Sequence, residues 1–170
     1  DRGARPFADR DGGDQLGAMS ASQIGALGIA QLRSISQDQI GSLTPAQAAG
    51  FTVTQIKSFS TQQVAALTAS QLGVMSNGAI SVLSAKQVAA MSAAQVQALN
   101  GAQISVLSPS VIGALTADQL NALSNDQIAS LGAAQIKGLA RGQIGAMDAA
   151  QLAKFSAAQL SALTAGQAAA

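Results

Sequence analysis

The 170-residue sequence contains no Cys, His, Glu, Trp or Tyr. Without Cys, a disulfide framework and a thiolate metal site are excluded, and without His the most frequent general base is missing. Charged residues make up only 10% of the chain, against about 25% in average soluble proteins, and the net charge is +1. Nucleic-acid binding depends mainly on basic contacts to phosphate, so we expect no nucleic-acid partner.

Long apolar runs are also absent, although hydrophobic residues make up 48% of the chain. Ser and Gln interrupt each stretch before it reaches the roughly 18 residues that a membrane span needs, so no transmembrane helix is expected. The sequence has no initiator Met and no recognisable signal peptide. We therefore expect a mature product or a fragment.

What the sequence does contain is a glutamine that returns every eight residues. From Gln15 to Gln167 this step reaches twenty positions, and eighteen of them are Gln, the exceptions being Ala79 and Val111. A fixed short period indicates a repeat architecture, so we expect one octapeptide-repeat array over residues 15–170. Residues 1–14 hold seven of the seventeen charges together with three Gly and Pro6, which is typical of a flexible leader or linker.

Each octad reads S/T, x, x, Q, I/L/V, x, small, L/M/F, and we number these positions as places 1 to 8. Ser or Thr followed three residues later by Gln is the capping-box pattern of a helix start. Pro45 and Pro109 follow place 1, at the first helical position, where a missing N–H costs nothing. Each octad is therefore predicted to be a helix of six or seven residues. Representative caps are Ser84, Gln87, Ser92, Gln95, Thr116, Gln119, Ser124 and Gln127.

Places 5 and 8 carry the large apolar side chains and are the predicted core. Examples are Val88, Met91, Val96, Leu99, Leu120, Leu123, Ile128 and Leu131. One long helix would rotate this apolar stripe by about 80° per octad and could not bury it. The fold class expected is an all-α solenoid of short capped helices. A β-solenoid is the alternative, although a single strand would place these two positions on opposite faces.

The constant eight-residue spacing of Gln leaves two interpretations of its role open. Gln either closes the capping box and nothing more, or it also links one repeat to the next. Glu would serve the capping box equally well, yet stacked carboxylates would repel, whereas a neutral amide both donates and accepts. The second interpretation predicts Gln side chains that are buried and hydrogen-bonded to backbone. The pattern does not give the number of octads per superhelical turn.

No catalytic constellation is apparent, so we expect neither an enzyme nor a cofactor. The charged residues of the array are scattered, and Asp118 and Asp126, which share place 3 of adjacent octads, most simply form a solvated pair. Asp9, Asp11 and Asp14 lie among glycines and are a weak calcium candidate, with a plain acidic linker as the alternative. The segment is too short for an EF-hand loop and lacks its terminal Glu.

The run from Leu115 to Ser124 resembles the L-[ST]-x-x-Q-[ILV]-x-A-L tracts of large, repetitive bacterial secreted or surface proteins. The resemblance extends over residues 15–170. It implies an extracellular or cell-surface location and a structural or adhesive role, and it implies no catalytic residues.

These observations predict a structural segment that acts as a stiff rod, stalk or filament-forming element. The sequence ends inside a repeat, at Ala168-Ala169-Ala170, without a polar capping repeat. Solenoids normally need such caps for solubility, so we expect continuation in a longer array or self-association, end to end or laterally. The alternative function is an adhesin-like binding module that presents its surface to a peptide or glycan.

Overall fold

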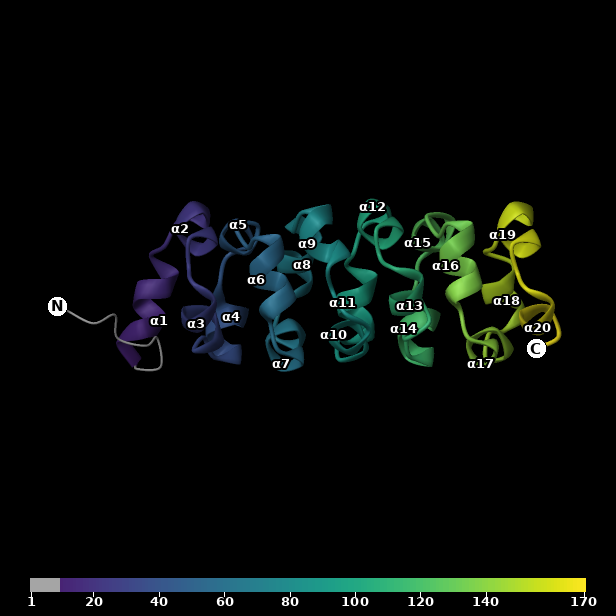
Figure 1. Ribbon diagram of the computed structural model, residues 1–170, viewed down its shortest axis with the longest axis horizontal. Helices are drawn as coiled ribbons and strands as arrows, with labels where there is room; N and C mark the ends of the chain where they lie inside the picture. Colours follow the sequence, from purple (N-terminus) through teal and green to yellow (C-terminus); the bar gives the residue numbers. More distant parts are fainter. Residues whose placement is uncertain (1–9) are drawn as a thin grey trace.

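The described residues form an elongated stack of short helices, with the first and the last of these helices at opposite ends of the long axis (Figure 1). This computed structural model describes residues 10–170, and side chains from Asp14 onward. The described residues form twenty helices and no strand. The all-α solenoid is therefore confirmed, and the β-solenoid alternative is wrong for this part of the chain.

One helix corresponds to each octad. In chain order the helices are α1 (Arg10–Gly17), α2 (Ala21–Gly25), α3 (Ile29–Arg33), α4 (Gln37–Ser42), α5 (Pro45–Ala48), α6 (Val53–Ser58), α7 (Thr61–Ala65), α8 (Ala69–Val74), α9 (Asn77–Ser81), α10 (Ala85–Ala89), α11 (Ala93–Gln97), α12 (Gly101–Ser105), α13 (Pro109–Ile112), α14 (Ala117–Asn121), α15 (Asn125–Ala129), α16 (Ala133–Gly138), α17 (Arg141–Gly145), α18 (Ala149–Leu152), α19 (Ala157–Ser161) and α20 (Ala165–Ala168).

The helices are shorter than expected. From α2 onward they contain four to six residues, because the chain leaves the helix before the octad ends. In α4 the backbone N–H of Leu43, at place 8, donates to the carbonyl oxygen of Ile40, three residues earlier, at 3.3 Å. Leu43 itself is extended, with φ −60° and ψ 141°. This extended residue turns the chain toward the next cap.

Helices that lie three steps apart in the chain pack on one another, as α5 does with α8 and α13 with α16. Side-chain hydrogen bonds meanwhile join octads four steps apart; for example, Gln103 donates to the carbonyl of Leu72. Since each octad contacts both the third and the fourth octad along the chain, one superhelical turn takes between three and four octads.

Places 5 and 8 line a continuous core along the axis of the stack. The eight core residues named above from Val88 to Leu131 are all buried. Phe51 and Phe59 occupy place 8 of adjacent octads, and their rings meet edge to face with centroids 5.0 Å apart. Beside them in the chain, Ala48 replaces the usual Ile, Leu or Val at place 5 and is fully buried. The core is therefore repetitive in position without being identical in side-chain size.

Gly50 and Gly138 are two of the glycines that allow a close approach between turns. A Cβ on Gly50 would collide with the carbonyl oxygen of Ala21, and one on Gly138 with that of Pro109. In both pairs place 7 of one octad lies against place 2 of the octad three steps earlier. The absence of a side chain at these glycines permits the close approach, because the atoms that a Cβ would meet are main-chain atoms.

None of the described helices has the length and apolar character needed to cross a membrane.

Candidate functional site

Most helices begin with reciprocal hydrogen bonds between place 1 and place 4. In α10 the backbone N–H of Gln87 donates to Ser84 Oγ at 3.3 Å, and the backbone N–H of Ser84 donates to Gln87 Oε1 at 2.8 Å. Fourteen of the described helices have both bonds. At Gly28, Gly132 and Ala140 the hydroxyl half is missing, but the Gln oxygen still accepts from the cap N–H. These bonds satisfy donors that a helix start otherwise leaves open.

The amide nitrogen of the same glutamines joins successive turns. Gln103 Nε2 donates to the carbonyl oxygens of Leu72 and Met75 at 2.8 and 2.9 Å. Thirteen glutamines make this pair of bonds, always to places 5 and 8 of the octad four steps earlier. We call this set of bonds the glutamine ladder. It confirms the interpretation in which Gln both caps its own helix and links repeats.

The ladder also explains why place 4 carries Gln and not Glu, for a reason that differs from the expected one. The place 4 side chains do not face one another across turns. Each Gln amide instead faces two backbone carbonyl oxygens, and twelve of these Gln side chains are buried. A carboxylate there would direct an acceptor at acceptors, away from water, which is costly. Gln is required by the carbonyls that it meets and not by repulsion between equivalent side chains.

Two octads lack the ladder residue, and they lie four steps apart, one above the other. Ala79 and Val111 fill place 4 with buried apolar groups, and Ser76 and Ser108 still accept the backbone N–H bonds of their helices. A Gln at position 79 would donate to the carbonyl of Phe51. Within the described part of the chain, no other side chain donates to that carbonyl. The array thus tolerates isolated gaps, because neighbouring octads keep their own bonds.

A third departure lies near the end of the array. Gln151 Nε2 donates to Asn121 Oδ1 at 2.6 Å and not to the backbone carbonyls of that octad. Lys154 Nζ, from place 7, donates to the carbonyl of Leu123 at 3.3 Å. Helix α18, which carries Gln151, has no buried residue. A lysine thus contacts one of the two carbonyls that a glutamine serves elsewhere.

The sequence offered one weak metal candidate and no catalytic group. Among the described residues there is no cluster of three His, Cys, Asp or Glu side chains. Asp9 and the side chain of Asp11 lie outside the described residues, so the calcium candidate is not tested. Asp118 and Asp126 lie on the consecutive helices α14 and α15, whereas the helices that pack together are three steps apart.

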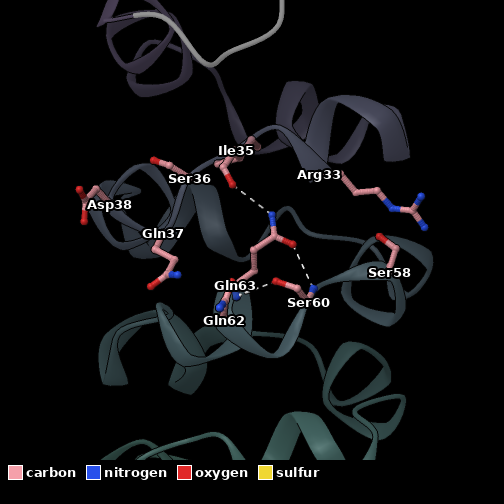
Figure 2. Close-up of a pocket in the computed structure, with 9 residues that line it drawn as sticks. All are labelled: Arg33, Ile35, Ser36, Gln37, Asp38, Ser58, Ser60, Gln62 and Gln63. Carbon is pink, nitrogen blue, oxygen red and sulfur yellow. Dashed lines mark hydrogen bonds between the residues drawn. The ribbon is translucent and has the colours of Figure 1, made fainter.

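A polar groove of about 640 Å³ lies between two turns near α4 and α7. Figure 2 shows Arg33 at one side of it, Asp38 at the other and Gln62 between them. Gln37 and the hydroxyls of Ser36, Ser58 and Ser60 complete its polar lining. Arg33, Gln37, Asp38 and Gln62 are all exposed. Their side chains have no hydrogen bond or ion pair within the described part of the chain, so they are free to contact a ligand.

This groove was not predicted from the sequence, in which the charged residues of the array are scattered. Arg33 and Gln62 are far apart in the sequence and line the same groove only because one turn packs on the next. Once the stacking of octads is known, the sequence does indicate the groove. Polar side chains then fall together at place 6 of one octad (Arg33), places 2 and 3 of the next (Gln37 and Asp38) and place 3 of the octad three steps further on (Gln62).

Comparison with known proteins supports the repeat motif. A family model described as the ALTTAQ repeat matches residues 101–133. This segment contains Ala114-Leu115-Thr116 and Gln119, which coincide with four of the six letters in that description. The match spans helices α12 to α15 and the start of α16. No curated protein matches the chain.

Proposed function

We propose that this chain is the structural repeat segment of an exported or cell-surface protein, where it acts as a stiff rod, stalk or filament-forming element. The glutamine ladder is the observation that carries the proposal. Each ladder Gln holds its own helix cap and two carbonyls of the preceding turn, so bending or stretching the stack would break several buried hydrogen bonds at once. An elongated array whose stability comes from neighbour-to-neighbour contacts behaves as a quasi-one-dimensional object.

The export and surface parts of the proposal are supported by composition and by the resemblance to secreted repeat tracts. A chain without Cys tolerates an oxidising environment, and a charged fraction of 10% leaves a nearly neutral surface. A purely structural role, without catalysis or a cofactor, is supported by the absence of His, Cys and Glu from the sequence.

A filament would form by self-association of this chain through the apolar surface at its last turn. At the last turn an apolar groove of about 360 Å³ is lined by Met147, Leu152 and Leu163 among others. Leu160, at place 5, is 43% exposed there, whereas the place 5 residue Ile128 is 1% exposed inside the array. Ile128 is covered by a following turn of the array. A second copy of the chain, or further octads, can cover Leu160 in the same way. A head-to-tail contact of this kind builds an open filament.

Deletions test the rod directly. Removing residues 84–91 takes out one whole octad, so the ladder glutamines that follow the deletion still meet an equivalent pair of carbonyls and the chain should fold into a shorter rod. Removing residues 84–87 shifts the register by half an octad and should disrupt the stack. Small-angle scattering and circular dichroism measure the two outcomes. If the whole-octad deletion loses helicity as severely as the half-octad deletion, or keeps the original maximum dimension, the rod proposal is wrong.

Two matched substitutions test the mode of association. Leu160→Asp should abolish any concentration-dependent assembly seen by analytical ultracentrifugation. Val74→Asp changes a side chain that is similarly exposed, at 48%, on the side of the array, and it should leave end-to-end assembly intact. Loss of assembly with Val74→Asp alone would indicate lateral association, and a monomer at all concentrations would contradict filament formation.

A further inference from the structure

The polar groove between α4 and α7 is a local departure from the composition of the array. Its long side chains come from place 6 (Arg33), places 2 and 3 (Gln37 and Asp38) and place 3 three octads later (Gln62). Ser58 contributes from place 7. One octad earlier, the equivalent five places hold Gly25, Ile29, Ala30, Gly50 and Thr54, and one octad later they hold Gly41, Pro45, Ala46, Ala66 and Ser70. The capping scheme does not require polar residues at these places, so their concentration here is independent of the fold.

The groups in the groove have unused hydrogen-bonding capacity. Ser60 Oγ accepts from Gln63 N at 3.1 Å, which leaves its hydroxyl hydrogen free to donate. Ser58 Oγ donates to the carbonyl of Gln55 at 2.7 Å and can still accept. The amides of Gln37 and Gln62 each offer one acceptor and two donors. The groove therefore presents a row of neutral donors and acceptors between a guanidinium and a carboxylate.

This lining fits a saccharide and not a peptide. Peptide recognition uses a sheet edge, an apolar groove for a helix, aromatic platforms for proline-rich segments, or clusters of Arg for acidic motifs. The lining holds a single Arg and no aromatic residue. The described residues contain no strand, and the apolar member of the lining, Ile35, is 3% exposed. Sugar hydroxyls both donate and accept, as Ser and Gln do, and vicinal hydroxyls can donate to a carboxylate such as Asp38. Arg33 adds a planar fork that matches a carboxylate bidentately.

We propose that this groove binds a saccharide that carries a carboxylate, such as a uronic-acid unit of a glycan. The guanidinium of Arg33 receives the carboxylate, while Gln37, Asp38 and Gln62 receive ring hydroxyls. The site goes beyond the proposed rod function, because a rod can carry a binding site on its side without relying on it. Because the side chains that would contact the ligand are exposed to solvent, we expect weak single-site binding, with a Kd on the order of 1 mM.

The test uses the whole chain and trigalacturonate as the probe. Titration followed by nuclear magnetic resonance should show saturable shifts of the side-chain amides of Gln37 and Gln62. Arg33→Ala should weaken binding about tenfold or more, and so should replacing the probe by its methyl ester, which removes the charge. Lys57→Ala is the matched control, because Lys57 is an exposed cation that also occupies place 6 but lies outside the groove. It should leave the Kd unchanged.

Three outcomes would overturn the proposal. They are the absence of saturable shifts up to about 10 mM trigalacturonate, an unchanged Kd in the Arg33→Ala variant with intact circular dichroism, and displacement of the saccharide by an acidic peptide of higher affinity. The last result would reassign the groove to peptide binding. None of them affects the deletion test of the rod, so the two proposals fail independently.

Discussion

Gln103 Nε2 lies 2.8 Å from the carbonyl oxygen of Leu72, thirty-one residues earlier in the chain. The same amide holds the cap of its own helix through Oε1, which accepts from the backbone N–H of Asn100 at 2.9 Å. One side chain thus couples the start of a helix to the end of a helix in the turn before. This coupling makes the stability of each octad depend on the octad four steps away, which is the expected behaviour of a solenoid.

The first prediction follows from the direction of these bonds. Gln103→Glu keeps the size of the side chain but removes the two N–H donors and places a buried carboxylate against two carbonyl oxygens. We expect it to lower the free energy of unfolding at neutral pH by about 3 kcal/mol or more, and Gln103→Ala by about 2–4 kcal/mol, since buried acceptors then lose their donors. Urea unfolding monitored by circular dichroism measures both.

The pH dependence distinguishes this cause from a general loss of packing. Burial and the two carbonyls should raise the pKa of the introduced carboxyl above that of a free Glu, because both disfavour the charged form. With the folded pKa above the unfolded one, stability is retained below the unfolded pKa and lost as the pH rises through the folded pKa. Gln97→Glu, at an exposed place 6, is the control. Equal losses in the two Glu variants would contradict the ladder's role.

The local structure of each octad was predictable from the sequence, but the way octads stack was not. The capping box and the Pro45 and Pro109 positions depend only on residues within one octad, so spacing alone predicts short helices. The angle between successive helices depends on the backbone between places 6 and 8, where Leu43 is extended. The residue types at these places do not predict that angle. The partners of Gln103 and the presence of Arg33 and Gln62 in one groove both follow from this angle. Gln151 could not be predicted either, because its choice of Asn121 depends on a neighbour thirty residues away.

A second prediction concerns the close approach of Gly138 to Pro109. Gly138→Ala places a Cβ about 2.9 Å from the carbonyl carbon of Pro109, and main-chain atoms cannot move away cheaply. We expect a loss of roughly 1–3 kcal/mol, the usual cost of overpacking. Gly142→Ala is the matched control, because nothing lies within 4 Å of its Cβ. It should gain about 0.5–1 kcal/mol from helix propensity. Thermal unfolding that moved in the same direction for both variants would refute this account.

A third prediction concerns the weakest cap. Ala140 precedes α17 and makes no side-chain cap hydrogen bond, and the backbone N–H of Gln143 instead donates to the Ala140 carbonyl at 3.0 Å. Ala140→Ser adds the missing acceptor and should stabilise the chain by about 0.5–1 kcal/mol. Ser92→Ala removes an existing cap bond of 3.1 Å to Gln95 N and should cost a similar amount. The two melting temperatures should move in opposite directions, and a decrease for Ala140→Ser would show that cap chemistry does not limit α17.

The last prediction concerns Asn121, which holds Gln151 away from the backbone. Its Oδ1 accepts from Gln151 Nε2 at 2.6 Å, so the carbonyl of Leu120 lacks its glutamine donor and that of Leu123 accepts from Lys154 Nζ instead. Asn121→Ala removes this competitor, and Ala already occupies place 6 in other octads, for example at Ala65 and Ala129. The amide of Gln151 can then turn to the carbonyls of Leu120 and Leu123, as equivalent glutamines do. We expect a gain of about 0.5–1.5 kcal/mol, from one more neutral hydrogen bond and higher helix propensity.

An unfolding curve gives only the overall change in the free energy of unfolding, whereas hydrogen exchange shows which helix is stabilised. If Gln151 joins the glutamine ladder, backbone amides of α18 should exchange more slowly in Asn121→Ala than in the parent chain, because that turn is then tied to the previous one. Asn125→Ala changes the same residue type at an exposed place 2, where no ladder bond is involved, and should leave α18 exchange as it was. Faster exchange in α18 after Asn121→Ala would mean that the Gln151–Asn121 bond stabilises this turn better than the ladder bonds would.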